Sequence, residues 1–491
     1  MQMKIGTLHN CWLSLIVLCC VIIPCESSFA EHALPNVMIV LCDDLGYGDI
    51  GCYGHKLVKT PHIDRFAIQG LRLTDCYAAA PNCSPARTGL MTGRTPYRVG
   101  VYNWIPFLSP MHVRDSEVTI AQLLKSAGYQ TCHVGKWHLN GWFNLPGQPQ
   151  PDDFGFDYWL STQNNALPNH RNPYNFVRNN IPAGPLQGYS SKLVADEAIT
   201  WLNSIDGDNP FFMYVCFHEP HEPIATDPQY AGIYGQGENP SLEAHHGNIT
   251  QMDAAFGRIM QQLDDMQVTE NTLVIFTSDN GPAMTRWHPH GSTDGLRMFK
   301  GHLYEGGIRV PGLVRWPAHV AAGRTSDVPV CSLDFLPTLC EIADIDPPAD
   351  RVLDGTSLLS FFEGGKLARK KPIYWQFNYA QSAPRVAIRD GDWKLVASLD
   401  PNDQGNLTDI TEQQIHQLKV CRLETFQLYH MREDRAETQD LAAVEPERLQ
   451  QMIATMTAIF EEVQTESPAW PVWSWPRYEA QRIEWPTYPR P

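Results

Sequence analysis

The sequence predicts an α/β fold: a large mixed, mostly parallel sheet flanked by helices, with a smaller C-terminal α+β domain built on an antiparallel sheet. Two observations support it. Continuous apolar runs alternate with helical patterns through most of the chain, which is typical of a mostly parallel sheet. Near residues 366–372 the pattern changes to short strands with a polar turn and one long amphipathic helix. We therefore expect an export signal at 1–30, a large domain at 31–370 and a small domain at 371–491.

Four apolar runs predict the central strands of the sheet. Three of the runs are continuous and apolar, as expected of strands that are buried on both faces, and Thr131–Gly135 is a shorter strand candidate. Charged or histidine-bearing residues follow each run, and in open α/β sheets ligands bind outside the carboxyl ends of the strands. The four strand ends therefore predict one shared site. The runs are Val37–Cys42, Thr131–Gly135, Phe211–Phe217 and Leu273–Thr277.

The segments between and after these runs complete the predicted fold. Helical patterns connect the strands, and the small domain shows a hairpin with a polar turn, a further short strand and an amphipathic helix. The Trp- and Pro-rich tail after Ser467 shows no clear secondary structure. The helical patterns cover residues 118–127, 189–205 and 249–266, and the small-domain elements cover 386–396, 426–429 and 446–464.

The net charge of the chain limits its partners. At −17, the chain has no excess of Lys and Arg to meet the phosphates of a nucleic acid, so we expect no nucleic-acid partner. A small basic pocket can still exist on an acidic surface, so an anionic small substrate stays compatible with this charge.

The N-terminus resembles a secretory signal. Lys4 precedes the apolar run Trp12–Pro24, which is short for a membrane span, and residues 28–30 form a small-x-small cleavage site. We expect cleavage and an exported protein with no membrane attachment, periplasmic or extracellular if the host is bacterial. An uncleaved anchor or a lipid at Cys19-Cys20 is the alternative. Export permits disulfides, and we expect one or two at most among the cysteines left after cleavage.

Two pairs of oxygen-bearing residues follow the first and the last of the four runs. These residues are Asp43 with Asp44, and Asp279 with Asn280. Four hard oxygen donors without sulfur or imidazole favour Ca²⁺ or Mg²⁺ over zinc. A single Asp-Asp pair is more often a helix cap or a solvated turn. Two pairs placed after buried strands favour a metal site.

The stretch Asn82–Arg94 contains an unusual cysteine. Pro85 suits the first turn of a helix and would place Cys83 at its N-terminus, where free N–H groups favour negative charge. Arg87, one turn on, adds a fixed cation to the same place. The alternative is a buried structural cysteine in front of a capped helix. The pattern favours a site for a dense anion.

The run Cys-Ser-Pro-Ala-Arg-Thr-Gly from Cys83 resembles the signature of the type I sulfatase family, in the alkaline phosphatase superfamily. The resemblance implies that Cys83 is oxidised to formylglycine by a formylglycine-generating enzyme, and that the hydrated aldehyde, a gem-diol, is the nucleophile. It also implies one Ca²⁺ ion, held by an oxygen of the formylglycine at position 83 and by the two oxygen-bearing pairs, Asp43, Asp44, Asp279 and Asn280. Residues 31–370 would then be the catalytic domain.

Three further motifs extend this resemblance. Gly135–Leu139 matches the second sulfatase signature and carries Lys136 and His138, although Asn140 replaces the usual Gly after it. His221, or alternatively His218, matches the sulfate-contacting histidine, and Lys300 matches the second sulfate-binding lysine. The resemblance implies that Lys136, His221 and Lys300 neutralise the sulfate and that His221 or Lys300 protonates the leaving alcohol. It also implies that Arg87, with the metal, lowers the pKa of the attacking hydroxyl, and that His138 accepts a proton. A lysine beside a strand is otherwise usually a surface residue, and a histidine is usually structural.

The predicted activity is hydrolysis of sulfate esters on a carbohydrate. Residues 291–297 resemble a loop of N-acetylgalactosamine-6-sulfatase-like members, which suggests a 6-sulfated galactose or N-acetylgalactosamine type of sugar. Two alternatives remain: a phosphonate or phosphate ester hydrolase of the same superfamily, and a non-catalytic protein that binds sulfated glycans. The candidate sugar contacts are Asn103, Trp104, His288 and His290, and Trp104 could instead simply be packed.

Overall fold

The fold is organised around a ten-stranded mixed sheet with the strand order β11-β2-β10-β9-β1-β8-β4-β5-β6-β7. The computed structural model describes residues 1–2, 34–207, 209–378, 383–400 and 408–488. The predicted export signal lies almost wholly outside these residues. The strands of this sheet are β1 Asn36–Asp43, β2 Leu71–Leu73, β4 Gln130–Lys136, β5 Tyr158–Thr162, β6 Val177–Arg178, β7 Ile181–Pro182, β8 Phe211–Pro220, β9 Thr272–Ser278, β10 Gly312–Arg315 and β11 Arg324–Ser326.

The centre of this sheet is parallel and its edges are antiparallel. Strand β1 pairs in parallel with β8 and β9, so that Val40 lies opposite Val215 on one side and Phe276 on the other. Strand β4 pairs in parallel with β8 and β5. In contrast, β10 runs antiparallel to β9 and β2, and β6 runs antiparallel to β5. The four predicted central strands are thus confirmed as β1, β4, β8 and β9, and they lie near one another in the sheet.

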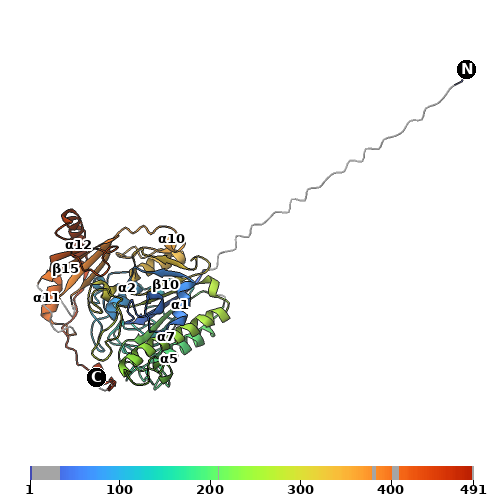
Figure 1. The fold of residues 1–491 in the computed structure, drawn as a ribbon, viewed down its shortest axis with the longest axis horizontal. Coiled ribbons are helices and arrows are strands. Elements are labelled where there is room, and N and C mark those ends of the chain that lie inside the picture. The colour runs from blue at the N-terminus through green and yellow to red at the C-terminus, as the bar shows by residue number, and fades with distance from the viewer. Residues whose placement is uncertain (3–33, 208, 379–382, 401–407, 489–491) are drawn as a thin grey trace. The chain divides into compact units, whose positions relative to one another are not determined.

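Helices cover both faces of the sheet, as the unbroken apolar runs predict. Residues 37, 39 and 41 of β1 enter one core and residues 38, 40 and 42 enter the other, because successive side chains of a strand point to opposite faces. Helices α2, α4 and α9 contribute to the first core, and α1, α5 and α7 to the second; α5 and α7 lie side by side (Figure 1). Their bounds are α1 Pro61–Ile68, α2 Cys83–Thr92, α4 Ile120–Ser126, α5 Ser190–Leu202, α7 Pro240–Asp265 and α9 Phe335–Ile342.

One predicted helix starts earlier than expected. Helix α7 begins at Pro240 and not at residue 249. The side chain of Asn239 accepts a hydrogen bond from Leu242 N, and Pro240 occupies the first helical position, which together make a strong helix start. The prediction missed this start because the first turns carry polar residues that break the apolar periodicity.

A four-stranded antiparallel sheet, in the order β13-β14-β15-β16, follows the large sheet in sequence. It contains the predicted hairpin and short strand, and α12 is the predicted amphipathic helix, so the predicted fold class is confirmed. Residues of both sheets share one continuous core, and a domain boundary at 370/371 stays a prediction. The bounds are β13 Ile373–Phe377, β14 Arg385–Asp390, β15 Trp393–Asp400, β16 Arg422–His430, α11 Glu412–Val420 and α12 Pro446–Glu466 (Figure 1).

The remaining elements are short. A two-stranded sheet joins β3 to β12, and four α-helical turns and several 3₁₀ turns connect the larger elements. Among the described residues, no helix has both the length and the apolar character that crossing a membrane requires. The bounds are β3 Cys76–Tyr77, β12 Val330–Cys331, α3 Pro96–Val99, α6 Pro228–Ala231, α8 Glu305–Ile308 and α10 Leu359–Phe362, with 3₁₀ turns at 51–53, 269–271, 332–334 and 479–481.

The expected disulfides do not form in the described part of the chain. All nine of its cysteines, from Cys42 to Cys421, are free, and eight of them are buried. Two large cores already hold the chain together, so the fold does not need the cross-links on which small exported domains depend.

Candidate active site

The carboxyl ends of four neighbouring strands meet at one edge of the large sheet. Strand β1 ends at Asp43, β4 at Lys136, β8 immediately before His221 and β9 immediately before Asp279. These strands are adjacent in the order β9-β1-β8-β4. The sheet therefore brings together residues that lie far apart in the sequence, at the edge where the pattern of apolar runs predicts a shared site.

The oxygen-bearing residues form a buried cluster. Asn280 Nδ2 donates to Asp44 Oδ1 at 2.7 Å, and the amide of Asp44 lies 3.2 Å from Asp279 Oδ1. Within the described chain, Asp43 Oδ1 and Asn280 Oδ1 are buried without a hydrogen-bond donor. Buried oxygens rarely stay unpartnered, so these two fit a hard cation that takes carboxylate and amide oxygens.

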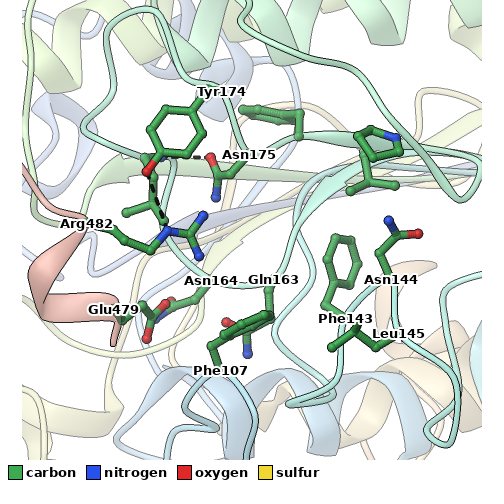
Figure 2. Close-up of a pocket in the computed structure, with 14 residues that line it drawn as sticks. Phe107, Phe143, Asn144, Leu145, Gln163, Asn164, Tyr174, Asn175, Glu479 and Arg482 are labelled. Atoms are coloured by element: carbon green, nitrogen blue, oxygen red, sulfur yellow. Dashed lines mark hydrogen bonds between the residues drawn. The ribbon is translucent and has the colours of Figure 1, made fainter. Parts of the chain in front are cut away.

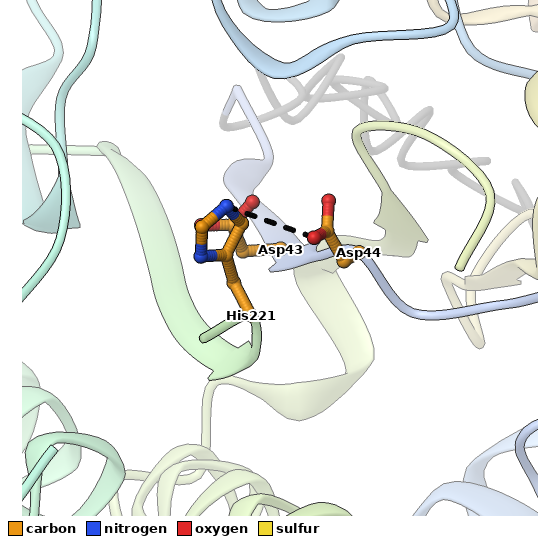
Figure 3. A group of neighbouring side chains, drawn as sticks. All are labelled: Asp43, Asp44 and His221. Carbon is orange, nitrogen blue, oxygen red and sulfur yellow. Dashed lines mark ion pairs between the residues drawn. The ribbon is translucent and has the colours of Figure 1, made fainter. Parts of the chain in front are cut away.

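A histidine joins this cluster. Ligand atoms of Asp43, Asp44 and His221 lie within 4.8 Å of one another (Figure 3). His221 Nε2 is 3.7 Å from Asp44 Oδ2. His218, the alternative residue in the sequence, instead faces Thr162 Oγ1 at 2.8 Å and is 1% exposed. The structure thus places His221, and not His218, in contact with the carboxylates.

Two lysines pair with the two aspartates after β1. Lys136 Nζ lies 2.7 Å from Asp43 Oδ2, and Lys300 Nζ lies 2.6 Å from Asp44 Oδ1. Burial alone would raise the pKa of Asp43, but the nearby cations, led by Lys136, hold that pKa well below its usual value. Burial likewise lowers the pKa of Lys300, but Asp44 outweighs it and raises the pKa overall. Lys300 therefore presents positive charge at the cluster.

Arg87 holds the third aspartate. Its Nε and Nη2 atoms lie 2.9 and 2.8 Å from Asp279 Oδ2, and both side chains are fully buried. Arg87 Nη1 also donates to the carbonyl of Lys136 at 2.8 Å. This guanidinium thereby ties helix α2 to the ends of β9 and β4. A buried pair of this kind fixes the positions of the groups on each of these elements.

Cys83 is the first residue of α2, as the proline-containing motif predicts. Asn82 is the N-cap, and its Oδ1 accepts from Cys83 N at 2.8 Å and lies 3.3 Å from Cys83 Sγ. Cys83 is 3% exposed, and burial raises its pKa although Lys136 and Lys300 act against this rise. The unmodified side chain is therefore a neutral thiol, which is a weak nucleophile.

His138 follows β4 and is fully buried. Its Nε2 lies 3.0 Å from the carbonyl of Ile105, which can only accept, so Nε2 carries the proton. Its Nδ1 has no partner among the described residues and is free to accept a proton. Burial, followed by the charges of Lys136 and Arg87, lowers the pKa of His138 well below its usual value. The ring is therefore neutral, and its one free acceptor is Nδ1.

The four predicted sugar contacts fall in different places. Asn103 accepts from Asn82 Nδ2 at 2.9 Å, and the ring of Trp104 lies 6.4 Å from that of His138, so both are close to the reactive groups. His288 is held by Glu222 at 2.8 Å and by Tyr488 at 2.9 Å. His290 contacts Ser241, His245 and His246, none of which belongs to the carboxylate cluster. Contact of all four residues with a sugar stays a prediction.

A cavity of about 250 Å³ beside the cluster contains residues that the sequence reading missed. Gln163 and Asn164, which directly follow β5, line it together with Glu479 and Arg482 from the C-terminal tail (Figure 2). The sequence contains a signal for Gln163 and Asn164, because five polar residues, 161–165, follow the apolar segment that ends at Leu160. The C-terminal tail shows no apolar periodicity, so the sequence does not predict the positions of Glu479 and Arg482.

Comparisons with known proteins agree with this geometry. The family model described as Sulfatase matches residues 35–345, and one described as N-sulphoglucosamine sulphohydrolase, C-terminal, matches residues 296–420. Arylsulfatase A of Homo sapiens is 34% identical over 383 residues, which are 73% of this chain and 74% of its own. N-acetylgalactosamine-6-sulfatase of Homo sapiens is 30% identical over 465 residues, which are 88% of this chain and 85% of its own.

A solved structure extends the likeness to the fold. The crystal structure of Ps i-CgsB in complex with k-i-k-neocarrahexaose aligns with a TM-score of 0.76 at 26% identity, covering 91% of this chain and 96% of that one. Residues 35–345, which the Sulfatase family model matches, include all the strand ends that form the cluster. The chain therefore belongs to the sulfatase family of sulfuric ester hydrolases, in the alkaline phosphatase superfamily.

Proposed function

We propose that the protein hydrolyses sulfate esters of a carbohydrate, of the 6-sulfated galactose or N-acetylgalactosamine type, with a formylglycine at position 83 and one calcium ion. The observation that carries this proposal is the convergence of Lys136, Lys300 and Arg87 on the carboxylates at the strand ends, next to the N-terminus of α2. The N-acetylgalactosamine-6-sulfatase relative and the loop at 291–297 support the choice of sugar.

The residues present fit both groups that the family implies. Asp43, Asp44, Asp279 and Asn280 would hold the calcium ion, since two of their oxygens are buried and lack donors. The ion would supply a fixed positive charge for the sulfate oxygens. A formylglycine at position 83 would supply a hydrated aldehyde as the nucleophile, with a second hydroxyl on the same carbon for release of the sulfate.

Formation of this group requires an enzyme that oxidises Cys83. The thiol is 3% exposed at the buried start of α2. A modifying enzyme cannot reach it in the folded protein, so conversion takes place before the chain folds. The formylglycine-generating enzyme is therefore a partner in maturation and not in catalysis.

The side chains of the cluster divide the remaining work. Lys136 and Lys300 place two ammonium groups beside the carboxylates, where they bind sulfate oxygens and stabilise charge that develops on them. His221 or Lys300 protonates the leaving alcohol, and both reach the cluster from its open side, with 20% and 15% of their side chains exposed. His138 accepts a proton at Nδ1. Arg87 orients Asp279.

The test of this function is a panel of esters assayed with the matured enzyme. We expect sulfate release from an aryl sulfate and from 6-sulfated galactose or N-acetylgalactosamine saccharides. A higher rate on aryl phosphonate than on aryl sulfate would assign the protein to the alternative hydrolase. Tight binding of the sulfated saccharides without any release of sulfate would make it a glycan-binding protein.

Replacing either sulfate-binding lysine should lower turnover strongly. Lys136→Ala and Lys300→Ala should each reduce kcat by roughly a hundredfold or more, the scale for one preorganised donor to developing charge. Substitution of either lysine by Gln should not restore kcat, since Gln does not supply the missing charge. Steady-state assays on an aryl sulfate measure the effect, and circular dichroism checks the fold. Lys192→Ala is the control, because Lys192 is 61% exposed and, among the described residues, forms its one ion pair with Asp196. Near-normal rates in both variants would remove the lysines from the mechanism.

A further inference from the structure

The cavity beside the catalytic cluster has the size of a single-ring ligand. Its volume is about 250 Å³, below the range of roughly 300–1,000 Å³ for drug-sized ligands. Two parts of the chain that are far apart in sequence form it: the loop after β5, and the tail with its 3₁₀ turn at 479–481 (Figure 2). None of its lining residues has a part in the proposed chemistry.

The cavity lies directly next to the sulfate-binding end of the sheet. Thr162, the last residue of β5, pairs with Lys136 on β4, and neighbouring strands are about 4.8 Å apart. The lining residues Gln163 and Asn164 come next in the chain, and the amide of His138 donates to the carbonyl of Gln163 at 2.8 Å. Burial raises the pKa of Glu479, and the charge of Lys136 opposes this rise. A sugar whose sulfate lies at Lys136 therefore has its neighbouring ring within reach of the cavity.

The floor of the cavity offers several hydrogen-bond acceptors. Gln163, Asn164 and Glu479 are 6, 7 and 6% exposed. Across the described chain, Gln163 Oε1 and Asn164 Oδ1 have no hydrogen-bond partner. Asn164 Nδ2 donates to Glu479 Oε1 at 3.2 Å and thus fixes both side chains. Buried acceptors without donors, in a cavity whose lining is otherwise mostly apolar and aromatic, match a sugar ring, which offers both hydroxyl groups and an apolar face.

Arg482 adds a cation at the side of the cavity. Its guanidinium carbon lies 5.9 Å from the ring centre of Phe107, 5.7 Å from that of Tyr174 and 5.3 Å from that of Tyr478. Its Nε lies 3.4 Å from Tyr174 Oη, and no carboxylate of the described residues forms an ion pair with it. The aromatic rings hold the guanidinium in place, and its other N–H groups remain available to an anion.

We propose that this cavity is a saccharide subsite for the ring next to the sulfated one, and that Arg482 binds an anionic group on that ring. This inference rests on the proposed function and names its substrate class: an oligosaccharide with a second negative charge beside the scissile ester. The side chains of Gln163, Asn164 and Glu479 accept hydrogen bonds from the hydroxyls of the ring. A sulfate and a uronic acid carboxylate share the chemistry that Arg482 recognises.

The test compares three disaccharides that carry the same scissile 6-sulfate. Their second ring is neutral, sulfated or a uronic acid, and the readout is kcat/KM on each charged disaccharide divided by kcat/KM on the neutral one. In Arg482→Gln this ratio should fall about 10- to 100-fold, the range for a hydrogen bond to a charged group, mainly through KM. Arg482→Lys should recover part of it, because the charge returns without the planar fork. The charged disaccharide with the higher ratio identifies the anion.

A matched control lies on the same tail. Arg477→Gln removes an equal charge from an exposed position outside the cavity and should leave the ratio unchanged. If Arg482→Gln leaves the ratio at its wild-type value while sulfate is released, the subsite is wrong and the proposed function stands. If the wild type releases no sulfate even from an aryl sulfate, the proposed function fails. Calorimetry with the uronic acid disaccharide then tests the cavity alone. Equal affinity of the wild type and Arg482→Gln for this disaccharide overturns the proposed subsite.

Discussion

Replacing Cys83 with alanine should abolish sulfate release while leaving the protein folded. Loss of a covalent nucleophile lowers kcat by on the order of 10⁵–10⁶-fold. The fold should survive, because Asn82 caps α2 through the backbone amide of Cys83 and not through its sulfur. Cys340→Ala removes another buried thiol, one in α9, and should keep nearly full activity. Rates on an aryl sulfate and thermal unfolding of both variants measure the contrast.

Two further measurements identify the chemical form of residue 83. A peptide that covers residues 78–87 of the active enzyme should show the mass deficit of thiol-to-aldehyde conversion and should react with a hydrazide. Cys83→Ser can attack sulfur but lacks a second hydroxyl, so it should stop after at most one turnover and retain the sulfate. Quantitative alkylation of Cys83 as a thiol in fully active enzyme would contradict the formylglycine assignment.

Asp279→Ala should cost both stability and metal binding. It leaves the guanidinium of Arg87 buried without its partner, and breaking a buried pair in this way costs about 3–5 kcal/mol of unfolding free energy. Chelation should abolish wild-type activity and Ca²⁺ should restore it, and added Ca²⁺ should raise the Tm of the wild type but not of the variant. Denaturant titrations with and without Ca²⁺ separate the two effects.

Two controls separate the ion pair from the metal. Asn280→Ala removes an oxygen donor without breaking an ion pair, so it should lose the Ca²⁺-dependent rise in Tm with a smaller loss of stability. Asp327→Ala removes an aspartate that is 64% exposed and paired with Arg432 at 3.5 Å, and it should cost less than about 1 kcal/mol. Full activity of the chelated enzyme would remove the metal from the mechanism.

The sequence predicts the centre of the fold well, because local rules determine it. Strands β1, β8 and β9 contain continuous apolar runs, β4 is a shorter and more polar strand, and the residues at the carboxyl end of each lie where the geometry of parallel sheets brings ligands. Asn82 and Pro85 likewise determine the start of α2 through local capping and backbone geometry. These features need no knowledge of which strands are neighbours, so a pattern in the sequence is sufficient to predict them.

The periphery of the site could not be predicted, because distant contacts determine it. The C-terminal tail shows no apolar periodicity, and contacts with distant residues hold it in place. Trp470 Nε1 donates to the carbonyl of Gly100 at 2.7 Å, and Trp473 forms an isolated antiparallel β-bridge with Ile410. Glu479 reaches Asn164 across more than three hundred residues of sequence. The choice between His218 and His221 was equally open, since the turn that ends β8 decides which of them points at Asp44.

The location of the cavity has an evolutionary consequence. The reactive groups lie on the strand ends and on α2, where a shift of one element disturbs all the others. The cavity wall that carries Glu479 and Arg482 instead belongs to irregular chain held by a few side-chain and single backbone contacts. Substitutions or changes of length in that segment leave the sheet intact. Selection can therefore alter which saccharides are accepted while the hydrolytic centre is inherited unchanged, and an exchange of tails between relatives reproduces such a step in the laboratory.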